Sequence, residues 1–156
     1  MLSNQKDLDK YFMQLAIKEA QKAFEEDEVP VGAVIVHKNQ VIGRAFNQTK
    51  LLKDPTAHAE MLAITQACEF LKSEYLPETA LYVTLEPCPM CLGAMILARI
   101  GKLIFGAREE KTGACGSIVN LLNDGKWNHK FKIQEGLLEF ESAALLKIFF
   151  SKKRRV

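Results

Sequence analysis

The sequence predicts an α/β protein in which helices cover both faces of a mixed five-stranded sheet. Two observations support this fold class. Short runs rich in Val and Ile alternate with longer stretches in which apolar residues recur every three or four positions. Two of the short runs are joined by a few polar residues and two others by a helical stretch, so we expect both antiparallel and parallel strand pairs. The length of 156 residues fits a single domain, with a core over about 9–150 and a basic tail over 151–156.

The chain is predicted to begin with a helix and a strand hairpin. Apolar residues are spaced as on one face of a helix over about 9–26, and Pro30 prevents its continuation. Residues 31–36 form a nearly continuous apolar run, as in a strand that is covered on both faces. The tight connection 38–40 leads to a second strand over 41–46, and the two strands are expected to pair antiparallel.

A loop over 51–56 and a second helix over about 58–71 are expected to follow the hairpin. Thr56 is a suitable cap for this helix, since its hydroxyl can accept a hydrogen bond from the first turn. His58 and Glu60 are two residues apart, which is about 200° around a regular helix. They can therefore share a site only if the helix begins at that site. The inner side of the helix is expected to carry Met61, Ile64, Cys68 and Leu71.

The second half of the chain is predicted to continue with a strand, a helix and a strand. The third strand is expected over 81–85, the helix over about 89–99 and the fourth strand over 102–105. A proline at the helix start is tolerated, since its missing N–H would have no partner there. This spacing implies a right-handed parallel crossover. A loop rich in glycine and charged residues then covers 106–117.

The last predicted elements are short, except for the final helix. A helical turn is expected near 118–122, a turn around Gly125 and a fifth strand over 131–134. An amphipathic helix is predicted over about 137–152. Its buried side is expected to carry Leu137, Phe140, Ala144 and Ile148.

The composition is that of an ordinary globular protein, with 48% hydrophobic and 26% charged residues, which is enough to build one core. The first ten residues are polar, and no run approaches the roughly 18 apolar residues of a membrane span. We therefore expect a cytoplasmic protein without a membrane partner, in which Cys68 is a small buried side chain and Cys115 a free loop thiol. Positive charge gathers at 152–155, which is either a solvated tail or a phosphate-binding segment.

The clearest chemical pattern is formed by His58, Glu60, Cys88 and Cys91. The Cys-x-x-Cys spacing lets two sulfurs face one tetrahedral ion, and His58 can add a third ligand. Three protein ligands leave one position of a zinc ion open for water, whereas a structural zinc takes four. Glu60 is then suited to transfer protons to and from that water. Cys-x-x-Cys by itself also fits a redox motif or half of a zinc ribbon, and the pattern does not exclude iron or another metal.

The order His-x-Glu followed by Pro-Cys-x-x-Cys resembles the known signature of zinc-dependent nucleoside and base deaminases. Longer segments are similar to the bacterial tRNA-specific adenosine deaminases. They are residues 30–34, 54–60, 82–88 and 106–113, and the ending Phe149-Phe150 with its basic tail. The resemblance extends from about Tyr11 to Arg155. It implies a three-layer α/β/α cytidine-deaminase-like fold, conversion of adenosine to inosine at the wobble position of a tRNA anticodon, and a homodimer.

The same resemblance implies roles for individual residues. His58, Cys88 and Cys91 would hold one zinc ion per subunit, and Glu60 would transfer protons while water attacks C6 of adenine. The substrate-binding residues would be Asn47, Ala107, Arg108, Glu109, Phe149 and Phe150. Two residues depart from the family pattern: Glu109 stands where the family commonly has Asp, and Pro89 where Val is more common. Because Phe149 and Phe150 are adjacent, one of them is expected to face the core.

Several alternatives remain open at this stage. Asn47 also suits a turn at the end of a strand. The zinc site also fits a deaminase of a free nucleobase or nucleoside, of the guanine or cytosine type, although the loop 106–113 and the basic end favour RNA. A non-catalytic zinc protein of the same fold is a third hypothesis, and the intact Glu60 argues against it.

Overall fold

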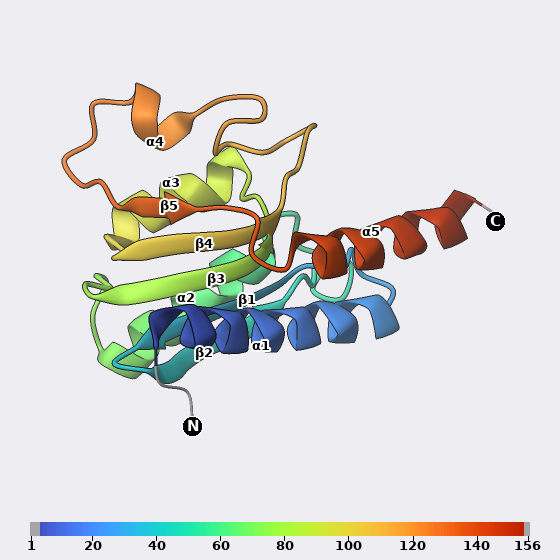
Figure 1. Ribbon diagram of the computed structural model, residues 1–156, viewed down its shortest axis with the longest axis horizontal. Coiled ribbons are helices and arrows are strands. Elements are labelled where there is room, and N and C mark those ends of the chain that lie inside the picture. The colour runs from blue at the N-terminus through green and yellow to red at the C-terminus, as the bar shows by residue number, and fades with distance from the viewer. Residues whose placement is uncertain (1–3, 155–156) are drawn as a thin grey trace.

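The computed structural model describes residues 4–154, which form three layers around one five-stranded sheet (Figure 1). The strands lie in the order β2-β1-β3-β4-β5. β1 pairs antiparallel with β2 and β3, whereas β3, β4 and β5 are parallel. The predicted mixed sheet is therefore confirmed. The strands are β1 Gly32–His37, β2 Gln40–Phe46, β3 Thr79–Leu85, β4 Lys102–Ala107 and β5 Lys132–Gln134.

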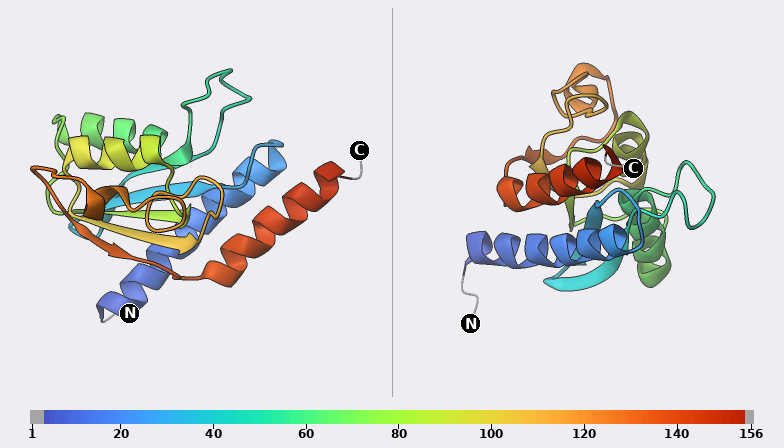
Figure 2. Two further views of the ribbon diagram at one scale, coloured as in Figure 1. Left: turned by 90° about the horizontal axis from the view of Figure 1, so that it is seen from above. Right: turned by 90° about the vertical axis from the view of Figure 1, so that its right-hand side faces the viewer.

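Helices cover both faces of this sheet, as predicted. Figure 2 shows α2 and α3 on one face and α1 and α5 on the other. Within residues 4–154, no helix is both long and apolar enough to cross a membrane. The helices are α1 Gln5–Glu25, α2 Ala59–Leu71, α3 Pro89–Ala98, α4 Leu121–Asp124 and α5 Glu139–Arg154.

The β1–β2 hairpin has a tight turn, and one glycine in each of its strands lets a helix lie close to the sheet. Lys38 and Asn39 have φ of 50° and 60°, the left-handed conformation of a tight two-residue hairpin turn. On one face, a Cβ at Gly32 would lie 2.5 Å from the Ala20 nitrogen of α1. On the other, a Cβ at Gly43 would lie 2.5 Å from the Ala63 carbonyl oxygen of α2. Both positions must therefore lack a side chain.

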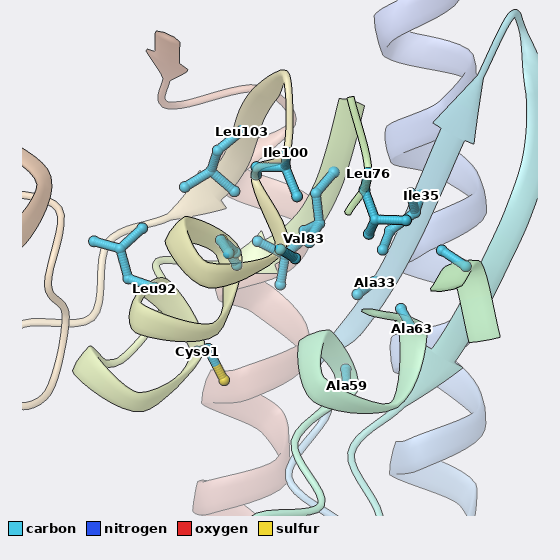
Figure 3. Close-up of a cluster of buried hydrophobic side chains, with 14 of the residues drawn as sticks. Ala33, Ile35, Ala59, Ala63, Leu76, Val83, Cys91, Leu92, Ile100 and Leu103 are labelled. Carbon is cyan, nitrogen blue, oxygen red and sulfur yellow. The ribbon is translucent and has the colours of Figure 1, made fainter. Parts of the chain in front are cut away.

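The larger core lies between the sheet and α2 and α3. Figure 3 shows side chains from β1, β3, α2 and α3 meeting there, including Val83 and Leu92. A second cluster on the α1 face includes Phe12, Met13 and Tyr82. Successive residues of β3 point to opposite clusters, which is why the strand is apolar throughout.

The buried face of α2 differs from the prediction. Its fully buried apolar residues are Ala59, Ala63 and Ala67, because only small side chains fit where the helix touches β2. The predicted residues Met61, Ile64, Cys68 and Leu71 are only partly buried and flank this alanine stripe. The predicted cap is also wrong, since the helix is preceded by His58 in extended conformation and not by Thr56.

Of the four residues predicted for the buried face of α5, only Leu137, which precedes the helix, packs against the core. Phe140 is 81% exposed and Ile148 49% exposed, and Ala144 also faces solvent. The buried residues are Ser142 and Phe149. The helix carries two apolar stripes, and periodicity cannot tell which one will face the molecule.

The basic end of the chain continues α5 as far as Arg154. Lys153 pairs with Asp27, with 2.6 Å between Nζ and Oδ1, and Lys152 lies 4.9 Å above the ring of Phe24. Residues 151–154 are thus helical, while the remaining residues of the predicted tail, Arg155 and Val156, lie outside the described part of the chain.

Candidate active site

Two helix starts bring His58, Cys88 and Cys91 together. His58 immediately precedes α2, Cys88 immediately precedes α3, and Cys91 lies in the first turn of α3. The His58 Nδ1 atom is 3.6 Å from the Sγ of Cys88 and 3.5 Å from the Sγ of Cys91. Within residues 4–154, these three side chains form the only group of at least three metal-binding side chains whose ligand atoms all lie within 4.8 Å of one another.

This spacing fits a tetrahedral metal ion. With metal–sulfur bonds of about 2.3 Å and a metal–nitrogen bond of about 2.0–2.1 Å, tetrahedral angles place the nitrogen and sulfur atoms about 3.5–3.6 Å apart. The two measured separations agree with that value. The three side chains could therefore hold a metal ion without rearrangement and leave a fourth position free.

The start of α3 favours a negatively charged sulfur. In the absence of a metal ion, a hydrogen bond with Cys91 lowers the pKa of the Cys88 thiol to about 4. Burial opposes this shift, and His58 contributes to it. The same bond and burial raise the pKa of Cys91, and the bond to Cys88 raises the pKa of His58. A thiolate at this position is the form that binds a metal.

Glu60 lies in the first turn of α2, beside the three ligands. It is 4% exposed, and burial raises the pKa of its carboxyl group above the ordinary value. Because His58 and Glu60 are two residues apart, they can share a site only if the helix begins at that site. The helix does begin there, and both residues line the same cavity.

That cavity has a volume of about 310 Å³ and contains three of the predicted substrate residues, Asn47, Glu109 and Phe150. Asn47 is buried at the end of β2, and its backbone N–H donates to the Val31 carbonyl at 3.1 Å. The remaining lining residues are Val29, Val31, Thr49, His58, Glu60, Leu85, Glu86, Cys88 and Thr112. Segments that are distant in sequence therefore form the walls of a cavity beside His58 and Cys88.

The other three predicted substrate residues do not line the cavity. Ala107 ends β4, is buried, and accepts a hydrogen bond from the Glu86 N–H at 2.8 Å. Arg108 points elsewhere and pairs with Glu135, with 2.7 Å between Nη2 and Oε2. Phe149 packs against Phe24 with 6.0 Å between ring centroids. As expected for adjacent residues, Phe149 is buried and Phe150 faces the cavity.

Glu86 is a cavity residue that the sequence analysis missed. Its buried carboxylate accepts hydrogen bonds from the backbone N–H groups of Glu109 (3.0 Å), Cys115 (2.9 Å) and Ser117 (3.2 Å) and from the Ser117 hydroxyl. Burial opposes ionisation, yet these bonds hold its pKa below the ordinary value. Glu86 therefore fixes the loop that carries Glu109 and Thr112. In the sequence, its position directly before Pro87-Cys88 could have indicated that Glu86 lies at the site.

The chain is similar in sequence and in structure to known deaminases. A family model described as MafB19-like deaminase matches residues 6–154. A tRNA-specific adenosine deaminase of Aquifex aeolicus (strain VF5) is 50% identical over 144 residues, which cover 92% of this chain and 95% of the relative.

Two solved structures are informative. One, from biochemical and structural studies of A-to-I editing by tRNA:A34 deaminases at the wobble position of transfer RNA, has a TM-score of 0.85 and 48% identity. The match covers 87% of this chain and 99% of that chain. A guanine deaminase from Nitrosomonas europaea has a TM-score of 0.76 over 97% of this chain and 87% of its own. At 22% identity, that likeness shows the fold alone.

Proposed function

This chain belongs to the tRNA-specific adenosine deaminases, and we propose on that basis that it converts adenosine to inosine at the wobble position of a tRNA anticodon. The observation that carries the proposal is the convergence of His58, Cys88 and Cys91 beside Glu60 on one cavity. In the overall reaction, water replaces the amino group at C6 of adenine, the C6–N bond breaks, and ammonia leaves.

We propose zinc as the metal, with one ion per subunit held by His58 Nδ1 and the sulfurs of Cys88 and Cys91. Two thiolates and one imidazole form a ligand set that zinc binds in other enzymes, and the observed N–S separations suit its tetrahedral geometry. When bound, zinc supplies a Lewis acid that lowers the pKa of a water molecule to about 7.

Glu60 is the proposed proton-transfer residue. Burial raises the pKa of its carboxyl group above the ordinary value, which makes the group a better proton acceptor during the reaction. In the proposed reaction, Glu60 takes one proton from the attacking water and delivers it to the adenine ring nitrogen. It then takes the remaining proton from the new hydroxyl group on C6 and delivers it to the departing amine, so that the C6–N bond breaks and ammonia leaves. Its place in the first turn of α2 keeps it beside the ligands throughout.

The cavity walls are proposed to recognise an unstacked nucleotide. Asn47 and Glu109 offer polar groups, and Phe150 offers a ring that is 43% exposed. An aromatic ring of this kind can stack on a base. Arg108, outside the cavity, is proposed to contact the RNA on its flank, while Phe149 and Ala107 support their cavity-lining neighbours. Bases of an anticodon loop suit such a site, since little pairing must be broken to extrude them.

We further propose that the protein is a cytoplasmic homodimer. Leu97 on α3 is 78% exposed, and Ile118 and Val119 before α4 are exposed by 50% and 43%. Exposed apolar side chains of this kind are available for a subunit interface. The cytoplasm is where its proposed tRNA substrate is found.

The test is to incubate the zinc-loaded protein with an anticodon stem-loop that carries adenosine at the wobble position. We expect inosine at that position, and we expect Glu60→Ala to reduce the rate by about 10²–10⁴-fold, the usual contribution of a proton-transfer residue. Metal analysis of both proteins serves as the control, because Glu60 is not a metal ligand. If Glu60→Ala retained the full rate, the proposed role would be wrong.

A further inference from the structure

Glu28 is a completely buried carboxylate next to the cavity, and the deamination reaction does not use it. The residue lies between α1 and β1, directly before the cavity residue Val29, and its exposed fraction is 0%. An ionised side chain is costly to bury unless several hydrogen bonds offset the lost hydration. The position of its partners therefore shows what the carboxylate stabilises.

All hydrogen bonds that Glu28 accepts come from one loop, which joins β2 to α2. Its Oε1 atom accepts from the backbone N–H of Lys50 at 3.1 Å and from the Thr49 hydroxyl at 3.4 Å. Its Oε2 atom accepts from the backbone N–H of Leu51 at 2.7 Å. The carboxylate thus binds three consecutive residues of a loop that is more than 20 positions away in the sequence.

Most other hydrogen bonds of this loop are internal, such as that from the Asp54 N–H to the Thr49 carbonyl at 3.0 Å. Besides Glu28, the Val31 carbonyl accepts from the Asn47 N–H at 3.1 Å and the Asp27 carbonyl from Lys50 Nζ at 3.1 Å. Figure 2 shows the segment between β2 and α2 projecting away from the sheet, and Leu51 and Leu52 at its tip are 50% and 53% exposed. A surface ion pair joins Lys50 to Asp27 at 3.4 Å, but both side chains are mostly exposed, so water and salt weaken it. A segment with so little apolar burial depends on its polar contacts for a fixed position.

The loop also carries one wall of the cavity. Asn47 lies at its beginning and Thr49 within it, and both side chains line the cavity. Glu28 itself does not line the cavity and is fully enclosed. The side chain of Glu28 therefore acts on the cavity through the loop residues that it binds.

We propose that Glu28 is a positioning residue that holds the Asn47–Thr49 wall in the geometry that binds the target nucleotide. This inference rests on the proposed function, since it concerns the recognition of that nucleotide. His58 and Glu60 lie at the start of α2 and Cys88 and Cys91 at the start of α3, whereas the Glu28 carboxylate binds residues 49–51. Loss of the Glu28 carboxylate should therefore weaken substrate binding and leave the chemical step nearly unchanged.

The variant Glu28→Gln tests this separation because it keeps the side-chain length but replaces one acceptor oxygen by an NH₂ group. We expect KM for the anticodon stem-loop to rise roughly tenfold while kcat stays within about threefold of the wild type. The bound metal should be unchanged. Glu28→Asp keeps the charge but is one methylene shorter, and it should show the same pattern.

Asp9→Asn is the matched control. Asp9 is another buried acid, 5% exposed, and it accepts hydrogen bonds from the Tyr82 hydroxyl at 2.6 Å and from Gln5 Nε2 at 2.8 Å. It packs on the α1 face of the sheet and does not line the cavity. If Glu28 had a purely structural role, Glu28→Gln and Asp9→Asn would both have lower thermal stability, and both would keep the wild-type KM. A wild-type KM in a folded Glu28 variant would overturn the proposal.

Amide hydrogen exchange of the wild-type holoenzyme gives a second test that requires no variant and no RNA. Lys50 and Leu51 have exposed side chains, yet their backbone N–H groups should be protected because Glu28 binds them. Rapid exchange at both positions would overturn the proposal even if neither variant folded. If the wild type did not deaminate the stem-loop, the proposed function would fail instead, and the exchange result would still stand on its own.

Discussion

The carboxylate of Glu86 occupies the space that a side chain at position 113 would need. A Cβ on Gly113 would lie 2.5 Å from Glu86 Oε1, which is far inside van der Waals contact. The Gly113 N–H also donates to the Glu109 carbonyl at 2.8 Å, so this glycine lies at the centre of the loop that Glu86 organises. The loop over the cavity therefore depends on the close approach of these two residues.

Gly113→Ala should displace the Glu86 carboxylate and disturb the loop. We expect a loss of about 1–3 kcal/mol in the free energy of unfolding, as for other overpacked positions, together with a lower kcat/KM. Urea unfolding and steady-state kinetics measure the two effects. Gly93→Ala is the control, because a Cβ at this position in α3 meets no atom within 4 Å. It should leave the protein as stable or make it more stable by about 0.5–1 kcal/mol.

The adjacent residues Phe149 and Phe150 should respond differently to truncation. Phe149 is 5% exposed, so Phe149→Ala should cost about 3 kcal/mol of stability through lost packing. Phe150 is 43% exposed and lines the cavity, so Phe150→Ala should change stability by less than about 1 kcal/mol. It should instead lower kcat/KM by roughly tenfold or more, if its ring stacks on a base. Equal effects of the two substitutions on activity per folded molecule would contradict this assignment.

Removal of one ligand should remove the metal. Cys88→Ala leaves one sulfur and one imidazole, so we expect little bound zinc after dialysis. We also expect no turnover, and added zinc should not restore it. Cys115→Ala changes a cysteine that lies outside the ligand group, and it should retain one zinc ion per subunit. Metal analysis with an activity assay compares the two variants, and full zinc occupancy in Cys88→Ala would refute the ligand assignment.

Cys115 is also expected to be unreactive. Burial, together with nearby carboxylates, raises the pKa of its thiol to about 12. At pH 8 only about one molecule in 10⁴ then carries the thiolate, the form that reacts with iodoacetamide. Mass spectrometry should show slow labelling of Cys115 in the folded protein and much faster labelling in urea. Labelling at the rate of the unfolded chain would show that the thiol is accessible and ionises normally.

Local patterns predicted most of this molecule. The hairpin, the parallel crossover and the group of His58, Cys88 and Cys91 all depend on short segments, so spacing and residue type were sufficient to predict them. The prediction failed where two apolar stripes compete on one helix. In α5, Phe140 and Ile148 form a regular stripe, but the stripe with Phe149 packs on the molecule, and only the docking of the helix decides between them.

The supporting residues of the site were harder to predict for a related reason. Glu28 and Glu86 are acidic residues that sequence patterns place on the surface, yet both are buried because loops distant in the sequence donate hydrogen bonds to them. No spacing rule connects Glu86 to Ser117 or Glu28 to Leu51. Such carboxylates become recognisable only when the loops are in place.

The proposed function requires that the cavity act on a nucleotide within RNA. The most direct measurement is a competition in which the zinc-loaded protein receives equal concentrations of a wobble-adenosine stem-loop, free adenosine, cytidine and guanine. We expect deamination of the stem-loop and no detectable conversion of the free compounds. Conversion of guanine or cytidine, with the stem-loop left intact, would contradict the proposed function and would identify a deaminase of small molecules.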